Sequence, residues 1–158
     1  MIASFCIIIL QILERYIWGI FGSVIIGRFI HFAEKIEPMA YTYGFEKLKV
    51  WQNSIALVKT IYCCTRNFPN EEKFGITSQI RRSSLSVPTN ISEGVSRKTP
   101  KDQAHFTTIA YSSLTETLNL LIIAKELSLM NEDDYARCRK QVEEVSFLLN
   151  NLRKSQQP

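Results

Sequence analysis

Three polar residues in the middle of the chain, Ser86, Asn90 and Glu93, have the types and spacing to do chemistry together. Steps of four and three residues place a hydroxyl, an amide and a carboxylate on one side of a helix. A serine becomes a nucleophile only beside a positioned base, and no histidine, second carboxylate or metal-ligand cluster accompanies this row. A serine near a glutamate on a helix is common and inert, so the sequence predicts a protein that is not an enzyme.

Basic side chains in the same part of the chain offer a different chemistry, the binding of phosphate. Residues 79–101 carry five basic side chains against one acid, and this local excess equals the net charge of +4 of the whole chain. Such groups contact phosphates and provide affinity without sequence choice, so nucleic acid is the expected partner, with a solvated helix face as the alternative. The predicted nucleic-acid-binding residues are Arg81, Arg82, Arg97, Lys98 and Lys101.

Metal chemistry is not indicated. No two cysteines have the C-x-x-C spacing of a metal site, and the two histidines, His31 and His105, have no partner at ligand spacing. The sequence therefore predicts no metal, no cofactor, and reduced thiols in a cytoplasmic protein. The cysteines are Cys6, Cys63, Cys64 and Cys138.

The polar and basic residues are expected on one helix, from about Ile76 to Arg97. Apolar or small residues recur along it at helical steps: Ile76, Ile80, Ser84, Val87, Ile91 and Val95. Pro88 lies inside this pattern and costs ~3 kcal/mol in a helix interior. Two helices meeting at Pro88 and one bent helix are both possible, and the second is favoured because the apolar row keeps its phase across the proline.

Two further features of this helix invite a structural explanation. Ser83 and Ser84 lie one turn before Pro88, and their hydroxyls could satisfy the carbonyl that the proline leaves unpaired. Gly94 is unfavourable in a helix by ~1 kcal/mol. Its presence indicates either fraying near the helix end or the close approach of another helix.

A helix is expected to precede the central one, from Phe45 to about Arg66, before the break at Phe68–Pro69. Apolar residues recur along it at steps of three and four, as in the narrow apolar stripe of a bundle helix. The residues predicted to face the core are Leu48, Trp51, Ile55, Val58 and Tyr62.

Two helices are expected after the central one, each with a capping residue. Thr99 caps a helix from Pro100 to about Leu129, and Asn131 caps a last helix. The core-facing residues predicted for the first are Phe106, Ala110, Ser113, Thr117, Leu121 and Ala124, and for the second Tyr135, Cys138, Val142, Val145, Leu149 and Leu152. Four helices joined by short turns predict an all-α fold, an antiparallel up-down-up-down four-helix bundle with a bent second helix.

Residues 1–38 form an apolar N-terminal extension with a different character. Two apolar runs of 12 residues are separated by Glu14 and Arg15, and neither reaches the ~20 residues that span a bilayer. One interpretation is upstream sequence read through from an early start codon, with the bundle domain at 39–158 beginning at Met39. The other is a membrane-associated extension, which would replace a cytoplasmic localisation by a membrane-bound one.

Three stretches of the chain, within Tyr43 to Leu152, carry a family resemblance: YGFEKLKVWQ, FPNEEKFGITSQIRRSSLSVPTNISEG and SLTE. In them the chain resembles the four-helix bundle family associated with intervening sequences in bacterial 23S ribosomal RNA. The accessory variability proteins of diversity-generating retroelements look like relatives. The chain departs from the family pattern at Leu120, where glutamine is frequent, and at Ser128, where glycine is common.

The resemblance implies a protomer that assembles into a homopentameric ring and binds nucleic acid, in retroelement relatives together with a reverse transcriptase. It implies no known catalytic activity. The expected function is an oligomeric nucleic-acid-binding bundle, and the alternative is a structural or adaptor ring that binds another protein. Residues expected to hold helices or subunits together are Gln79, Pro88, Asn90, Glu93, Gly94, Ser113 and Glu116.

Overall fold

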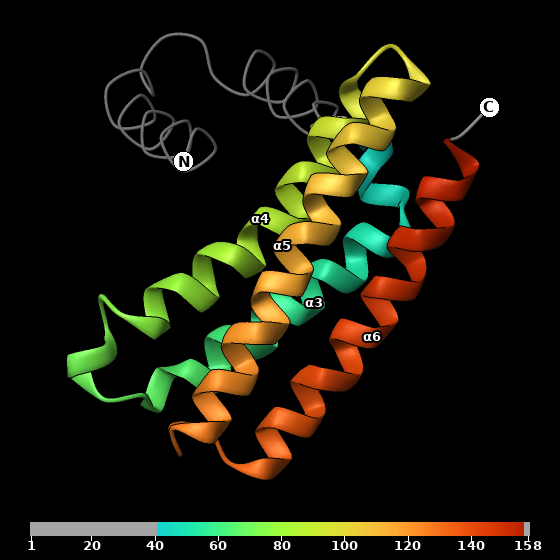
Figure 1. Cartoon of the computed structure of the whole chain (residues 1–158). Coiled ribbons are helices and arrows are strands. Elements are labelled where there is room, and N and C mark those ends of the chain that lie inside the picture. Colours follow the sequence, from blue (N-terminus) through green and yellow to red (C-terminus); the bar gives the residue numbers. More distant parts are fainter. Residues whose placement is uncertain (1–40, 157–158) are drawn as a thin grey trace, which may run out of the picture. The chain divides into compact units, whose positions relative to one another are not determined.

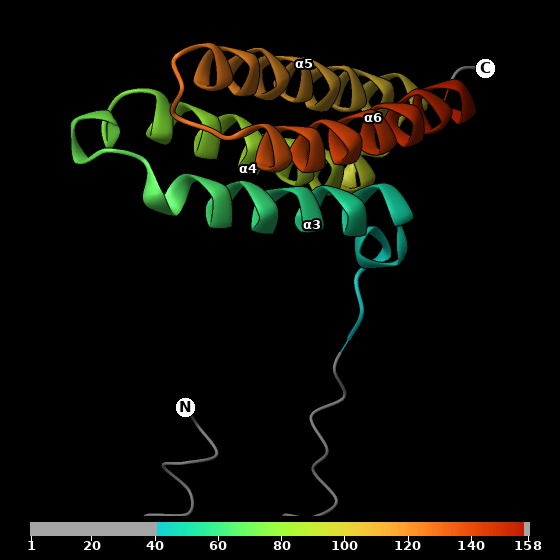
Figure 2. The same ribbon diagram turned by 90° about the horizontal axis from the view of Figure 1, so that it is seen from below.

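The structure is a computed structural model that describes residues 41–156, and in this range the chain is all-helical. Its long helices run antiparallel in up-down-up-down order, which confirms the predicted four-helix bundle (Figures 1 and 2). The long helices are α3 (Lys49–Cys64), α4 (Ile76–Ser96), α5 (Pro100–Glu126) and α6 (Glu132–Ser155). Short 3₁₀ turns are η1 (Gly44–Lys47), η2 (Thr65–Asn67) and η3 (Asn70–Glu72). The predicted extension at 1–38 lies outside the described residues.

Helix α4 is continuous through Pro88, and its axis changes direction along its length (Figure 1). The predicted single bent helix is therefore confirmed. The predicted compensation by the two serines is wrong. Ser83 Oγ donates to the carbonyl of Ile80 at 3.1 Å and Ser84 Oγ to that of Arg81 at 2.8 Å, so neither hydroxyl serves the carbonyl of Ser84, which the proline leaves unpaired.

The predicted caps begin α5 and α6. The side chain of Thr99 accepts a hydrogen bond from the backbone N–H of Asp102 at 3.1 Å, and that of Asn131 accepts one from Asp134 at 2.8 Å. Helix α5 ends at Glu126, earlier than predicted. The reason is Ser128, whose φ of 56° lies in the left-handed region that favours glycine and turns the chain toward α6.

Helix α3 differs most from its prediction. It begins at Lys49 rather than Phe45, because η1 ends first, and its buried face is another one: Val50, Ser54, Leu57, Val58, Ile61 and Cys64. Of the predicted face, Val58 is buried, Leu48 and Trp51 are partly buried and pack against the core, and Tyr62 is 39% exposed. Ser54 tolerates burial because its hydroxyl donates to the carbonyl of Trp51 at 2.6 Å.

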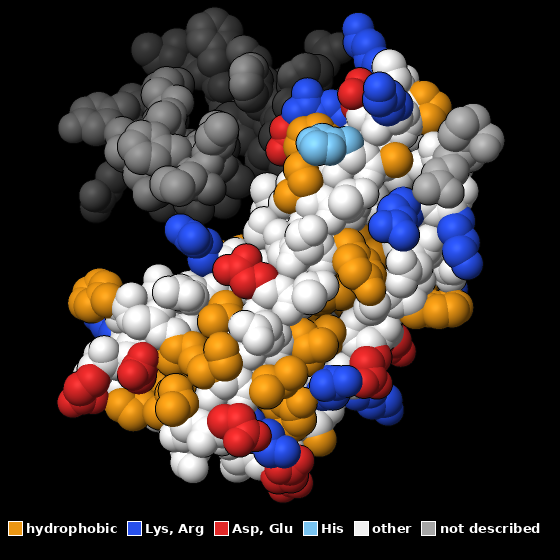
Figure 3. Space-filling view, in the orientation of Figure 1, with side chains coloured by type: hydrophobic (Ala, Val, Ile, Leu, Met, Phe, Trp, Pro, Cys, Tyr) orange, Lys and Arg blue, Asp and Glu red, His pale blue; other side chains and the backbone are white. Residues whose placement is uncertain are grey.

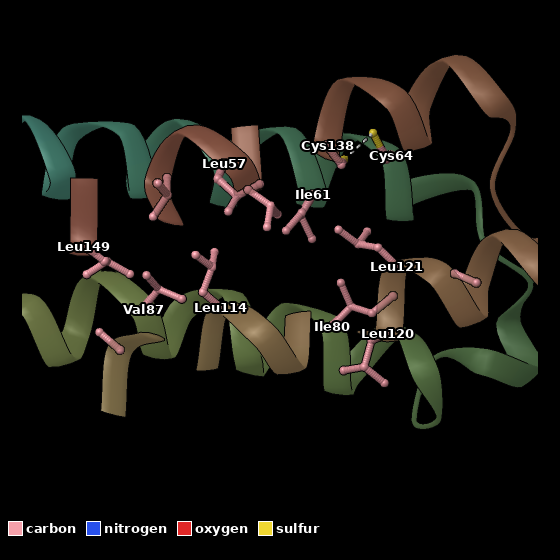
Figure 4. Packing of buried hydrophobic residues seen from close by; sticks show 14 of the residues in the cluster. Leu57, Ile61, Cys64, Ile80, Val87, Leu114, Leu120, Leu121, Cys138 and Leu149 are labelled. Atoms are coloured by element: carbon pink, nitrogen blue, oxygen red, sulfur yellow. Dashed lines mark hydrogen bonds between the residues drawn. The ribbon is translucent and has the colours of Figure 1, made fainter. Parts of the chain in front are cut away.

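The core fills the space between the four helices (Figure 4). The predicted face of α6 is confirmed, with its middle four residues buried and Tyr135 and Leu152 packed at its edges. Burial of one large aliphatic side chain contributes about 1.5–3 kcal/mol. The fully buried large side chains include Leu57, Ile61, Ile80, Val87, Ile91, Leu114, Leu121, Val145 and Leu149.

Candidate nucleic-acid interface

Small and hydroxyl-bearing residues lie where α4 contacts α5, a contact that we call the α4–α5 interface. It includes Ser83 and Ser86 of α4 with Ser113 and Thr117 of α5, and Gly94 of α4 with Phe106 of α5. Thr117 Oγ1 donates to Ser83 Oγ at 3.0 Å and also contacts the carbonyl of Ser113 at 2.8 Å. One turn along, the hydroxyls of Ser86 and Ser113 are 3.0 Å apart. The small side chains let the two helices approach, and each buried hydroxyl finds a partner there.

Helix α5 comes close to α4 at Gly94. A Cβ at this position would lie 3.0 Å from Cβ of Phe106 and 3.4 Å from the carbonyl oxygen of Gln103. The close-approach interpretation of Gly94 is therefore confirmed. Because both neighbours belong to the first turns of α5, the glycine fixes how the start of α5 packs on the end of α4.

The polar row that opened the sequence analysis joins this interface. Asn90 Nδ2 donates to the carbonyl of Ser86 at 2.7 Å and to its hydroxyl at 3.0 Å. Glu93 forms a salt bridge with Arg97 one turn further on, and both side chains are partly exposed. The hydroxyl of Ser86 thus contacts an amide and another hydroxyl, while the carboxylate is engaged by a guanidinium.

The paired arginines have different surroundings. Arg81 donates from Nε to the hydroxyl of Thr65 at 2.9 Å and from Nη2 to its carbonyl at 3.2 Å, and its guanidinium lies 4.7 Å from the ring centre of Tyr62. It therefore ties α4 to the end of α3. Arg82 is exposed, and its side chain makes no hydrogen bond or salt bridge within residues 41–156.

The other three predicted basic residues lie at the far end of α4. Arg82 and Arg97 are fifteen residues apart, which corresponds to roughly 22 Å along a helix. The five predicted residues therefore form two groups rather than one surface. Arg97 lies with its guanidinium 4.4 Å from the ring centre of Phe106, and Lys98 and Lys101 are exposed beside it.

Three chain segments meet at this end of the bundle. Gly44 of η1 approaches Val95 of α4, and Gln103 of α5 donates to the carbonyl of Arg97 at 2.9 Å. Thr107 donates to Gln156 at 2.8 Å, which holds the end of α6 beside the start of α5. The basic residues gathered here, which we call the basic end, are Lys47, Lys49, Arg97, Lys98, Lys101, Arg153 and Lys154.

The opposite end of the bundle is acidic. Figure 3 shows blue side chains gathered where α4 passes into α5, with red ones among them, and red and blue side chains together at the opposite end of the helices. Acidic residues of η3, of the end of α5 and of the start of α6 make up this acidic end: Glu71, Glu72, Glu126, Glu132, Asp133 and Asp134. The basic end also holds three acids and the acidic end four basic residues, so the two ends differ in net charge without being purely of one sign: Glu46, Glu93 and Asp102, and Arg66, Lys73, Lys125 and Arg137.

Two residues predicted to join helices or subunits are exposed in the protomer. Gln79 lies on α4 and Glu116 on α5, and neither side chain makes a hydrogen bond or salt bridge among the described residues. Their role between subunits stays a prediction. Sequence reasoning missed Thr65 as the partner of Arg81, and it missed Lys47, Lys49, Arg153 and Lys154, whose grouping could have been expected from the antiparallel helix order.

A pair of cysteine sulfurs lies in the core between α3 and α6. Sγ of Cys64 and Sγ of Cys138 are 3.9 Å apart, and Arg137 Nη2 is 3.4 Å from Sγ of Cys64. Burial, reinforced by the neighbouring Cys64, raises the pKa of the Cys138 thiol to about 12. Within residues 41–156 no three histidine, cysteine or acidic side chains form a group suited to a metal ion. Each helix in this range is too short or too polar to cross a membrane.

Comparisons with known proteins agree with this architecture. Residues 46–151 match the family model described as 23S rRNA-intervening sequence protein. The fold is similar to that of a protein of unknown function from the S23 ribosomal protein family of Bacteroides thetaiotaomicron. That likeness has a TM-score of 0.62 and 24% sequence identity, and covers 66% of this chain and 98% of that one. No curated protein matches the sequence.

Proposed function

Because the chain belongs to the 23S rRNA-intervening sequence protein family, we propose that it is a cytoplasmic, non-enzymatic and oligomeric protein that binds nucleic acid. The side chains of the basic end contact the phosphates of the nucleic acid. Of the residues predicted from sequence, Lys98 and Lys101 have the leading role and Arg97 a supporting one. Arg82 lies apart from them on α4 and adds a further cation.

The observation that carries this proposal is the placement of cations against the helix dipoles. Lys49 and Lys101 lie in the first turns of α3 and α5, where the positive end of the dipole disfavours them by about 0.3–1 kcal/mol each. The stability of the bundle does not account for them. They increase the positive potential of an end where the N-termini of α3 and α5 meet the C-termini of α4 and α6, so that the helix dipoles largely offset one another and the basic side chains set the sign of the charge.

Self-association would multiply this charge. Apolar side chains gather on the outer faces of α4 and α5 (Figure 3). On α5 and at its C-terminal end, Ile122, Ile123 and Leu127 are 37–58% exposed. Burial of this patch between subunits would stabilise an oligomer. A ring of five, the form expected from the family resemblance, would carry five basic ends, and affinity for a long nucleic acid would rise with their number.

The test is a charge reversal at the basic end, Lys98→Glu together with Lys101→Glu. Binding to a fluorescein-labelled RNA of about 20 nucleotides, followed by anisotropy at low salt, should weaken at least tenfold. Neutralising about four phosphates would give a slope of about −3 for log affinity against log salt, and the variant should have a shallower slope. Loss of folding is not a concern, because glutamate in the first turn of α5 suits the helix dipole.

The matched control reverses two other charges, Lys73→Glu together with Lys140→Glu. Both positions are exposed, Lys73 directly after η3 and Lys140 on α6, and the change in net charge is the same. It should leave affinity within twofold to threefold of the wild type. Equal loss in both double variants would mean that net charge alone matters. No loss in the Lys98/Lys101 variant would contradict the proposal.

An adaptor ring that binds another protein is the second candidate. Asn90 and Glu93 make contacts within the protomer, which suits a structural role better than contact with a ligand. The double variant Asn90→Ala, Glu93→Ala removes the Arg97 salt bridge and the contacts to Ser86. In native mass spectrometry, a fall in oligomer mass would support a structural role for these residues between subunits, and an unchanged mass would limit their role to the protomer. Wild-type protein that forms the oligomer but binds no RNA at low salt would favour the adaptor ring.

A further inference from the structure

A groove between α3 and the first half of α4 is separate from the basic end. It is open on one side and has a volume of about 690 Å³, within the range of small-molecule sites. Its lining combines apolar, aromatic and basic side chains and includes no acid: Val58, Lys59, Tyr62, Cys63, Arg66, Arg81 and Leu85. A flat, apolar and negatively charged group is the chemical class that suits this combination.

Tyr62 is the platform of the groove. Its ring is 39% exposed although it belongs to a helix of the core, and Arg81 holds the ring by stacking at 4.7 Å. Arg81 is itself fixed by its two hydrogen bonds to Thr65. The ring is therefore positioned before any ligand arrives, and apolar Leu85, 43% exposed, lies on the α4 side of the groove.

Two cations flank this platform, Lys59 on α3 and Arg66 in η2. Lys59 lies one turn before Tyr62 on the same face of the helix, and Arg66 follows the end of α3, and both line the groove. Both are exposed, and neither side chain has a salt bridge to an acid within residues 41–156. Anionic groups in contact with the ring would find a positive charge on either side.

We propose that this groove binds an unpaired nucleotide of a single strand. The base stacks on the face of Tyr62 that Arg81 does not cover, and Lys59 and Arg66 contact the phosphates on its two sides. This inference rests on the proposed function and specifies the form of nucleic acid. A duplex keeps its bases stacked inside, so it can use the basic end but not the ring, whereas a single strand can use both.

The experiment compares one RNA sequence as a single strand and as a blunt duplex, with affinities measured at the same salt. Tyr62→Leu removes the aromatic face and keeps the apolar volume. It should weaken single-strand binding about tenfold, the effect expected for losing one stacked base. Duplex binding should stay within twofold, so the preference for the single strand should fall.

The matched control is Phe147→Leu, which removes a 66% exposed ring from α6 that is not part of the groove lining. It should leave both affinities unchanged. Failure of the two proposals is distinguishable. If Lys98→Glu, Lys101→Glu leaves both affinities intact, the proposed function is wrong. If Tyr62→Leu leaves the single-strand preference intact, only the groove site is wrong.

A direct measurement does not depend on the long RNA. Titration of the full chain with a tetranucleotide should shift the backbone amide signals of Tyr62 and Cys63 in NMR spectra, and Tyr62→Leu should abolish the shifts elsewhere in the groove. Absence of shifts in the wild type overturns the site. A fall in oligomer mass on Tyr62→Leu without a change in preference would instead identify the groove as a contact between two copies of the chain, and would also overturn it.

Discussion

The two halves of the core are held together by different chemistry. The buried faces of α4 and α5 carry six hydroxyl residues. Two of them, Thr117 and Ser83, bond from one helix to the other, and a third, Ser113, bonds across to the half-buried Ser86 of α4. The buried face of α6 has only apolar side chains and that of α3 has one serine. The difference teaches that small polar residues bring two helices close, whereas large aliphatic residues on the other two fill the volume between them.

The largest effect is expected in the aliphatic half. Ile61→Ala removes a completely buried side chain of α3 and should lower the free energy of unfolding by about 3–4 kcal/mol, as deleted core side chains do. Denaturant unfolding followed by circular dichroism measures it. Ile123→Ala on α5, where the side chain is 39% exposed, is the control and should cost less than about 1 kcal/mol. Similar losses would mean that Ile123 is buried in an oligomer.

The next largest loss of stability is expected from overpacking the α4–α5 interface. Gly94→Val forces a side chain into space where even a Cβ is 3.0 Å from Phe106, and should cost about 2–3 kcal/mol of unfolding free energy. Gly44→Ala is the control, because its Cβ would lie 3.7 Å from Val95, an ordinary contact. If Gly94→Val left the free energy of unfolding unchanged, α5 would be able to move away without cost. Close packing would then not be the reason for a glycine at this position.

A smaller loss is expected when one hydroxyl is removed without a change of shape. Thr117→Val deletes the bonds to Ser83 and to the carbonyl of Ser113 and should cost about 1 kcal/mol. Thr115→Val on the same helix removes an exposed hydroxyl bonded only to the carbonyl of Tyr111, and should be nearly neutral in the same unfolding assay. If both variants behave alike, the hydroxyl pairs do not stabilise this interface.

The smallest effect at neutral pH comes from the thiols between α3 and α6. The raised pKa of Cys138, about 12 against 9.0, means that the folded state holds its proton more tightly than the unfolded state. Its contribution is complete below pH 9 and is lost as pH rises from 9 toward 12, at up to ~1.4 kcal/mol per pH unit. Between pH 8 and pH 11, the free energy of unfolding should fall less steeply for Cys138→Ala than for the wild type. Parallel slopes would contradict this.

The α6 face was predictable from sequence because its large apolar residues all lie on one side. Helix α3 has two apolar sides, one with Leu57 and Ile61 and one with Trp51 and Tyr62, so periodicity alone could not choose between them. Packing against the neighbouring helices makes that choice, and it places a serine and a thiol in the core. This is why the predicted face of α3 was only partly right, with Val58 buried and Leu48 and Trp51 at the edge of the core, while the predicted bundle is confirmed.

The candidate site shows the same limit. The helical spacing of Ser86, Asn90 and Glu93 is a local property and was predicted, whereas at Gly94 the sequence left fraying and close approach both open. The partner of Arg81 is Thr65, sixteen residues away in another segment, and no local pattern indicates it. The basic end needs η1, α4, α5 and α6 to meet, so only the antiparallel order of the helices reveals it.

The hydroxyl bonding between α4 and α5 has a practical consequence for any ligand that charge attracts. Among the described residues no salt bridge joins these two helices, since the Glu93–Arg97 bridge lies within α4. Contacts between neutral groups are barely affected by dissolved ions, whereas contacts with phosphates weaken strongly. Concentrated electrolyte should therefore strip a polyanion from the protein and leave the folded protomer unaltered, so that capture and release can be repeated on the same sample.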